Sequence, residues 1–365
     1  MITAIRQDRR RGRGAVSNAS GRFEGLARES VDDGWDSAAD LPPVPVEITR
    51  EAARSIIARN ASPDLPFDRS INPYRGCEHG CIYCYARPSH AYLGLSPGLD
   101  FETKLTVKPD AAALLRKALD RKGYTPAPIA LGANTDPYQR IEREHETTRG
   151  IVEVLLEYRH PFCITTKSAL VTRDLDLLTE AAALGIVRVA MSVTTLDHRL
   201  SRAMEPRASA PHLRFRAMER LAQAGVPVMA MTAPMIPALN DHEMERLLET
   251  ARDAGATSAG YVALRLPREI STLFREWLEE HYPDRAARIL SHIRTMHGGK
   301  DYDAEFGRRM TGTGPYAKLM AMRFGKAIAR LGLQQGRMGQ RADLFRPPPR
   351  AGDQFDLFAS DDGGG

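Results

Sequence analysis

The fold and the chemistry of this chain are decided by residues 75–85, which read RGCEHGCIYCY. Three of the four cysteines, Cys77, Cys81 and Cys84, lie within this stretch in a C-x3-C-x2-C pattern. Three thiolates at such close spacing suit a 4Fe-4S cluster that leaves one iron open. Two simpler alternatives are a zinc site with His79 as the fourth ligand, and buried apolar thiols. Zinc ligands usually come as two separated pairs, and no second pair follows here, so the pattern favours the cluster.

The loop and its flanking residues resemble a known family. The C-x3-C-x-Φ-C loop, with the aromatic Tyr83 before the third cysteine, resembles the signature of the radical S-adenosylmethionine (SAM) superfamily. The motifs NPYRGC (72–77) and CYA (84–86) resemble the branch related to spore photoproduct lyase, and the resemblance extends over residues 67–270. It implies that the three cysteines hold a 4Fe-4S cluster whose open iron binds SAM. It also implies a reducing electron donor of the flavodoxin or ferredoxin type, and cleavage of SAM to a 5′-deoxyadenosyl radical that abstracts hydrogen from a substrate.

Composition limits the class of protein. The 365 residues are 42% hydrophobic and 27% charged, which is enough apolar sequence for a sizeable core. No apolar run approaches about 18 residues, so we expect no membrane span, and the basic N-terminus lacks the apolar run of a secretory signal. The few cysteines indicate a reducing compartment, and we expect a cytoplasmic protein. The net charge of +5 permits an anionic partner such as nucleic acid.

From about residue 67 onward, short apolar strands alternate with helices. We expect strands at 70–74, 129–134, 162–166, 187–193, 226–231 and 260–264, and helices at 111–121, 148–158, 175–184, 211–224 and 242–254. This alternation predicts an α/β fold with a parallel sheet and right-handed crossovers. Six such units match the open (β/α)6 partial TIM barrel of the family, and a doubly wound open sheet is the structural alternative.

The regions outside this core are predicted from composition. Residues 1–66 are expected to form an N-terminal basic arm and linker, flexible over 1–40 and with a short helix at 51–60. Residues 67–270 form the predicted radical SAM core. A C-terminal helical region covers 271–335, with helices at 272–281, 284–297, 301–310 and 315–331. Residues 336–365 are expected to be a flexible tail, from which Leu344, Phe345, Phe355, Leu357 and Phe358 can dock back.

Polar residues follow several of the predicted strands, at the end where a barrel of this type binds its ligands. A carboxylate such as Asp136 pairs well with an ammonium group, and Lys167 suits a carboxylate. The alternatives are a turn that caps the next helix at Asp136, a surface lysine at Lys167 and a loop salt bridge at Arg207. The resemblance implies that SAM is contacted by Tyr83, Thr135, Asp136, Lys167, Ser192 and Arg207.

The loop residues around the cysteines have predicted roles of their own. Gly76 and Gly80 allow the tight turns that a cluster loop needs. Arg75 and His79 can donate hydrogen bonds near the sulfurs and so tune the cluster. The fourth cysteine, Cys163, lies four residues before Lys167, about 13 Å below it at the rise of a strand, so we interpret it as a buried core thiol. One remaining cysteine cannot ligate a second 4Fe-4S cluster.

The substrate is less defined by the sequence than the cofactors are. Spore photoproduct lyases carry a hydrogen-donating cysteine beside the Ser/Thr-Asp pair after the second strand, where this chain has Asn134. This departure argues against thymine-dimer reversal. The branch resemblance, the basic arm and the positive charge nevertheless favour a nucleic acid or nucleotide substrate. The alternative from another class is a non-enzymatic zinc or Fe-S module that docks nucleic acid. The sequence assigns no catalytic residue.

Overall fold

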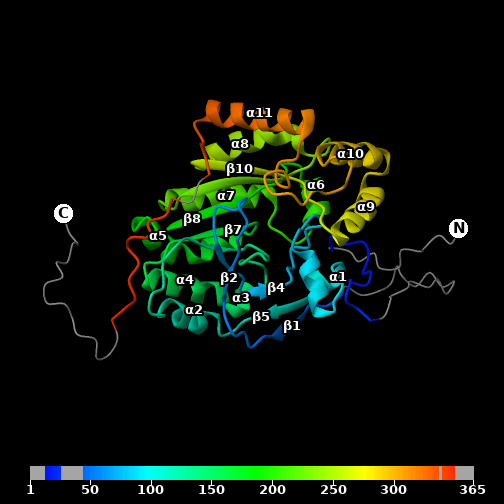
Figure 1. The fold of residues 1–365 in the computed structure, drawn as a ribbon. Coiled ribbons are helices and arrows are strands. Elements are labelled where there is room, and N and C mark those ends of the chain that lie inside the picture. Colours follow the sequence, from blue (N-terminus) through cyan, green and yellow to red (C-terminus); the bar gives the residue numbers. More distant parts are fainter. Residues whose placement is uncertain (1–12, 26–43, 337–338, 350–365) are drawn as a thin grey trace.

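A computed structural model describes residues 13–25, 44–336 and 339–349 of the chain. Within these residues the main sheet has eight strands in the order β11-β10-β9-β8-β7-β6-β3-β2 (Figure 1). Neighbouring strands are parallel, except that β2 is antiparallel to β3. The strands are β2 (Ile57–Arg59), β3 (Arg69–Ile71), β6 (Ile129–Leu131), β7 (Phe162–Thr166), β8 (Val187–Ser192), β9 (Val228–Met235), β10 (Ser258–Ala263) and β11 (Gln334–Gln335).

The crossovers between these strands contain helices that pack an apolar stripe against the sheet. In α4, for example, Ile151, Val154 and Leu155 are buried at helical spacing. The order from β3 through β6 to β10 follows the sequence, whereas a doubly wound sheet reverses its order at a switch point. The predicted (β/α)6 partial barrel is therefore confirmed. Its main crossover helices are α2 (Ala111–Leu119), α4 (Thr147–Glu157), α5 (Leu175–Ala183), α7 (Pro211–Gln223) and α8 (Met244–Asp253).

A second, smaller sheet frames the cysteine loop. Its strands are β1 (Glu47–Arg50), β4 (Tyr74–Arg75) and β5 (Lys104–Val107), with β5 in the middle. The cysteine loop leaves β4, passes through η2 (Arg87–Leu93) and α1 (Leu99–Thr103), and returns in β5. The predicted helix at 51–60 is wrong, because Ile57–Arg59 pairs with β3 and satisfies its backbone groups in the sheet. The remaining short elements are α3 (Glu142–His145), η3 (Ala169–Asp174), α6 (His198–Met204) and η4 (Asp241–Glu243).

Three long helices follow the barrel: α9 (Glu269–His281), α10 (Pro283–Met296) and α11 (Gly314–Leu331). Figure 1 shows α11 packed beside α8, on the opposite side of the molecule from β1 and β5. The predicted helix at 301–310 is wrong, since this segment forms turns. Asp301 accepts hydrogen bonds there from Ser271, Arg275 and Arg294, and Gly307 adopts a left-handed conformation with φ of +80°. These contacts favour a fixed loop over a fourth helix.

Described parts of both terminal regions are packed: Ala15 and Val16 contradict the flexible arm expected over residues 1–40, whereas Phe345 docks back as the sequence allowed. Ala15 and Val16 are buried against the cysteine loop region, and Figure 1 shows this segment beside α1. Near the other end, Phe345 packs against Tyr124, Tyr158 and His160. The predictions for residues 1–12, 26–43, 337–338 and 350–365 lie outside the described residues. In the described part of the chain, every helix is too short or too polar to span a membrane.

Candidate active site

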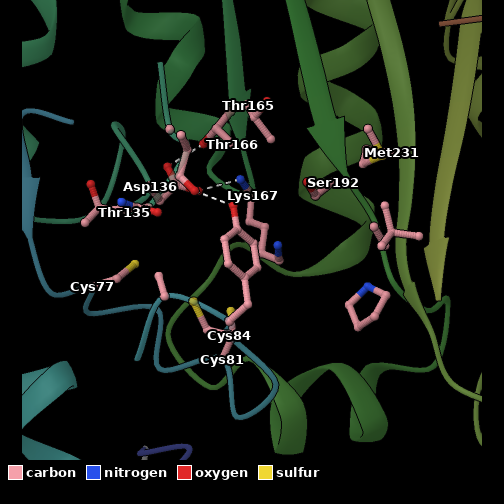
Figure 2. Close-up of a pocket in the computed structure, with 18 of the residues that line it drawn as sticks. Cys77, Cys81, Cys84, Thr135, Asp136, Thr165, Thr166, Lys167, Ser192 and Met231 are labelled. Carbon is pink, nitrogen blue, oxygen red and sulfur yellow. Dashed lines mark hydrogen bonds between the residues drawn. The ribbon is translucent and has the colours of Figure 1, made fainter. Parts of the chain in front are cut away.

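The candidate site is a cavity of about 280 Å³ at the carboxyl ends of the barrel strands. The cysteine loop forms one wall, and the residues at and after the ends of β6 to β10 form the other. Figure 2 shows the three cysteines along one side, with Thr135, Asp136 and Lys167 facing them. Carboxyl ends of parallel strands meet at one edge of a barrel, so residues far apart in sequence share this cavity.

The backbone of the cysteine loop is tightly constrained. Gly76 and Gly80 adopt left-handed conformations with φ of +74° and +65°. A Cβ at Gly76 would lie 2.9 Å from the Phe101 carbonyl oxygen, and one at Gly80 would lie 2.6 Å from a Glu102 carboxylate oxygen. The Cys77 amide donates to the Phe101 carbonyl oxygen over 3.0 Å. The glycines predicted from sequence are therefore required by conformation and by space.

A fully buried arginine holds this loop from beneath. Arg87 donates to the carbonyl oxygens of Gly80 over 3.0 Å and Cys81 over 2.9 Å. Its guanidinium pairs with Glu102 over 2.6 Å, and both side chains are 0% exposed. Glu102 in turn accepts the backbone amides of Gly14 and Ala15 over 3.0 and 2.8 Å. One ion pair thus fixes the loop and ties the N-terminal segment to it.

The three cysteines meet the requirements of a 4Fe-4S cluster. Cys77, Cys81 and Cys84 are free thiols that line the same cavity, and Cys77 and Cys81 are buried. Among the described residues, no three His, Cys, Asp or Glu side chains converge as ligands of one metal ion. A cubane does not need such convergence, because each thiolate binds a different iron. Burial raises the pKa of the Cys81 thiol to about 12, so the thiol would lose its proton when iron binds.

The polar groups opposite the cysteines include one with an unmet hydrogen bond. The hydroxyl of Thr135 is buried and has no partner among the described residues, although it lines the cavity. A buried hydroxyl without a partner is costly, so this atom is set to bond a ligand. Ser192 is also buried and lines the cavity from the end of β8. The residues present therefore fit both a cluster and a small polar ligand such as SAM.

Lys167 supplies a half-buried positive charge near the cysteine loop. Its ammonium lies 5.7 Å from the centroid of the Tyr83 ring. Burial opposes the charged form, but the Cys81 thiolate and the Glu205 carboxylate outweigh it and raise the pKa of Lys167. The Tyr83 hydroxyl donates to Glu205, which is paired with the buried Arg214. Lys167 is thus held as a cation that can meet an anionic group of a ligand.

Asp136 lines the cavity but is already saturated by protein donors. One carboxylate oxygen accepts the Thr166 hydroxyl over 2.6 Å and the Tyr138 amide over 2.9 Å. The other accepts the Lys167 amide over 2.7 Å and lies 3.3 Å from Nδ1 of His79. Burial would raise the pKa of Asp136, but these donors lower it to about 2. Asp136 therefore joins His79 of the cysteine loop to the end of β7 and positions both. This role is close to the alternative in which Asp136 stabilises a turn.

Two arginines predicted near the cofactors lie elsewhere. Arg207 is not among the lining residues, and it pairs with Glu78 over 3.4 Å, as in the salt-bridge alternative. Arg75 is exposed and pairs with Glu51 over 2.6 Å, so it does not face the sulfurs. Its side chain points away because alternate residues of β4 face opposite sides. Cys163 is buried and outside the cavity lining, as predicted.

Sequence reasoning missed the buried charges that support the site. None of Arg87, Glu102, Glu205 and Arg214 was predicted to support the site. One local signal was available: Arg214 lies within an otherwise apolar buried face of α7, beside Phe215, Ala217 and Met218. A charge in such a position is stable only with a buried partner. The partners themselves come from other elements and leave no signal in local spacing.

Comparisons with known proteins agree with this geometry. A protein-family model for the radical SAM superfamily matches residues 71–251. An uncharacterized protein of Mycobacterium tuberculosis is 39% identical over 226 residues, which cover 61% of this chain and 66% of that protein. An uncharacterized protein of Methanocaldococcus jannaschii is 26% identical over 66% of this chain and 85% of that protein.

Solved structures of spore photoproduct lyase share the fold. A point mutant of that enzyme has a TM-score of 0.58 and 16% identity, and covers 81% of this chain and 86% of its own. A complex with a dinucleoside spore photoproduct has a TM-score of 0.58 and 16% identity, and covers 79% of this chain and 81% of its own.

By the family-model match over residues 71–251, the chain belongs to the radical SAM superfamily. The cofactors of this superfamily are a 4Fe-4S cluster and SAM. The match disfavours the non-enzymatic zinc or Fe-S module that we considered as an alternative. The chain spans 66% of the length of its mycobacterial relative.

Proposed function

We propose that Cys77, Cys81 and Cys84 hold a single 4Fe-4S cluster, and that Thr135, Lys167 and Ser192 bind SAM beside it. The observation that carries this proposal is the meeting of three free thiols, an unpartnered buried hydroxyl and a half-buried cation around one cavity. Tyr83 contributes its ring to the same wall. When bound, these cofactors supply a 5′-deoxyadenosyl radical, formed by one-electron cleavage of SAM, that abstracts hydrogen from a substrate.

The chain's own residues bind, orient and exclude water. Lys167 is placed to pair with the SAM carboxylate, and the Thr135 hydroxyl is placed to bond a polar group of SAM. Asp136 holds the backbone amide of Lys167 and so fixes where that side chain begins. Buried apolar residues such as Ala130, Leu131 and Ala263 line the same cavity and keep water out.

The proposed substrate is a nucleic acid or nucleotide, and the proposed reductant is a protein of the flavodoxin or ferredoxin type. The likeness to spore photoproduct lyase with a bound dinucleoside and the net charge of +5 support this substrate class. Asn134 lines the cavity beside Thr135, where the lyases carry a cysteine. We therefore do not extend thymine-dimer reversal to this chain.

The experiment compares two cysteine variants after anaerobic reconstitution with iron and sulfide. Wild-type protein and Cys163→Ala should each hold about four iron atoms and cleave SAM when reduced. Cys81→Ala should lose SAM cleavage and most of its iron while it stays folded. Cys163 is the matched control because it is equally buried but outside the cavity. SAM cleavage retained by Cys81→Ala would contradict the proposal.

A further inference from the structure

Arg265 lines the same cavity as Lys167 and the other proposed SAM contacts, and it follows a different strand. It follows β10 by two residues, at the carboxyl edge of the barrel, and it lines the cavity. Its guanidinium carbon lies 4.4 Å from the centroid of the Tyr85 ring. Such close stacking uses the face of the guanidinium, so the N–H donors around its edge stay available for hydrogen bonds.

Other arginines near the cavity are neutralised, and Arg265 is not. Arg214 pairs with Glu205, and Arg309 pairs with Asp64 over 2.6 Å. By contrast, the structure gives Arg265 no hydrogen bond or ion pair with any of the residues it describes, although the side chain is half-buried. A half-buried guanidinium without an anion is unusual unless the anion arrives with a ligand.

The surrounding field reinforces the charge of Arg265. Lys167 and Arg309 lie within electrostatic reach of the same Tyr85 hydroxyl as Arg265. The nearby carboxylates already have other partners, since Asp64 accepts from Arg309 and Asp136 accepts from the Lys167 amide. Three cations therefore lie near the Tyr85 ring, and of these Arg265 has no carboxylate partner among the described residues.

Apolar side chains also line the cavity. Leu65, Phe67, Val262 and Met310 line the cavity together with Tyr85. A ligand with a flat apolar body and one anionic group would satisfy both the apolar wall and the guanidinium.

We propose that Arg265, stacked on Tyr85, binds an anionic group of the substrate, a phosphate or a carboxylate. This subsite is separate from Lys167, which is assigned to SAM. The inference rests on the proposed function, because it takes the part of the cavity beside the cysteine loop to be filled by SAM. It makes Arg265 a specificity-determining residue for the reaction.

The test measures binding by isothermal titration calorimetry on anaerobically reconstituted, SAM-loaded protein in phosphate-free buffer. The probes are phenyl phosphate, benzoate and neutral phenol, which share a ring and differ in charge. At least one of the two anions should bind, at least tenfold more tightly than phenol. The tighter anion identifies the group as phosphate or carboxylate. Arg265→Gln should weaken that anion at least tenfold and leave phenol unchanged, and Arg265→Lys should recover part of the loss.

Arg285→Gln is the matched control. Arg285 also stacks on a tyrosine, Tyr282 at 5.9 Å, but neither residue lines the cavity. This variant should bind both anions as wild-type protein does. Equal anion affinity in wild type and Arg265→Gln, or no anion binding in wild type, would overturn the subsite. The proposed function is judged separately, by whether SAM alters the cluster signal of the wild-type protein before any probe is added.

Discussion

Two buried arginine–glutamate pairs flank the cysteine loop, and they differ in the groups to which they bond. Arg87 and Glu102 bond almost wholly to backbone: the carbonyl oxygens of Gly80 and Cys81, and the amides of Gly14 and Ala15. The partners of Arg214 and Glu205 include side chains of the site. Glu205 accepts from the hydroxyls of Tyr83 and Thr194, and Arg214 donates to the Ser192 carbonyl oxygen over 3.0 Å.

The difference separates the shape of the loop from the charge of the cavity. Arg87–Glu102 lies outside the cavity lining and determines where the cysteine backbone runs. The Arg214–Glu205 pair acts on two residues that line the cavity. Glu205 accepts a hydrogen bond from Tyr83, and the charges of the pair influence the pKa of Lys167. Both pairs are fully buried, so removing one partner leaves an uncompensated charge. This should lower the free energy of unfolding by about 3–5 kcal/mol. The consequences for iron and for SAM should nevertheless differ.

The largest effect is expected from Arg87→Met. The unfolding free energy should fall by about 3–5 kcal/mol, because Glu102 is left buried and unpaired. Iron content after reconstitution should fall with it, since the carbonyl oxygens of Gly80 and Cys81 lose their donor. Iron analysis and denaturant titration check both statements.

Arg330→Met is the control for this variant, because Arg330 pairs with Glu249 at the surface. Its unfolding free energy should change by less than about 1 kcal/mol. Wild-type iron content in Arg87→Met would show that the loop does not need this brace.

Glu205→Gln should be almost as destabilising but should keep its iron. The amide can still accept from Tyr83, yet Arg214 loses its counter-charge, so we expect a loss of about 3 kcal/mol. The cysteine backbone is held by the other pair and should still assemble the cluster. If iron and stability fall together in both variants, the two pairs are not distinct in role.

His160 provides a buried base that has no acidic partner, in contrast to both pairs. Its Nδ1 donates to the Pro161 carbonyl oxygen over 2.9 Å, and its Nε2 accepts from the Tyr124 hydroxyl over 2.8 Å. Burial, with a smaller contribution from Arg69, lowers its pKa to about 4. The unfolded chain takes up a proton below about pH 6.5 and the folded chain does not. Stability is therefore full above pH 6.5 and is lost as the pH falls towards 4.

Because of His160, the free energy of unfolding should fall by up to about 2 kcal/mol between pH 6.5 and pH 5. His160→Gln should flatten that part of the stability profile, measured by denaturant titration at several pH values. An unchanged slope in the variant would assign the acid sensitivity to other groups.

Thr135→Ala should have the smallest effect, confined to SAM. Its hydroxyl has no protein partner among the described residues, so its removal should leave iron content and stability close to wild type. SAM affinity should fall about tenfold, or about 1.4 kcal/mol. Thr194→Ala is the counterpart, because the Thr194 hydroxyl is bonded to Glu205 over 3.0 Å. It should lose about 1 kcal/mol of stability and keep its SAM affinity.

The sequence predicted the barrel well because its signals are local. Most core strands are short apolar runs, and amphipathic helices lie between them along the chain. The cysteine spacing likewise lies within eight residues and needs no knowledge of the fold. The places of Thr135 and Lys167 after their strands likewise made them candidate ligand contacts, and both line the cavity.

What the sequence could not supply depends on contacts between distant residues. The partners of Glu102, at Gly14 and Ala15, lie 88 and 87 positions away in the chain. The identity of the rings on which Phe345 docks, such as Tyr124, and the strand at Ile57–Arg59 likewise depend on long-range contacts that local sequence does not show. Arg207 and Asp136 were assigned to SAM because they are charged and near the barrel mouth, but protein partners occupy both.

The most direct test of the central claim is electron paramagnetic resonance of the anaerobically reconstituted, dithionite-reduced protein, with and without SAM. The account predicts a reduced 4Fe-4S signal that changes when SAM is added, because the cysteines leave one iron open beside Thr135 and Lys167. A cluster signal that does not respond to SAM, or a protein that takes up zinc in place of iron, would contradict it.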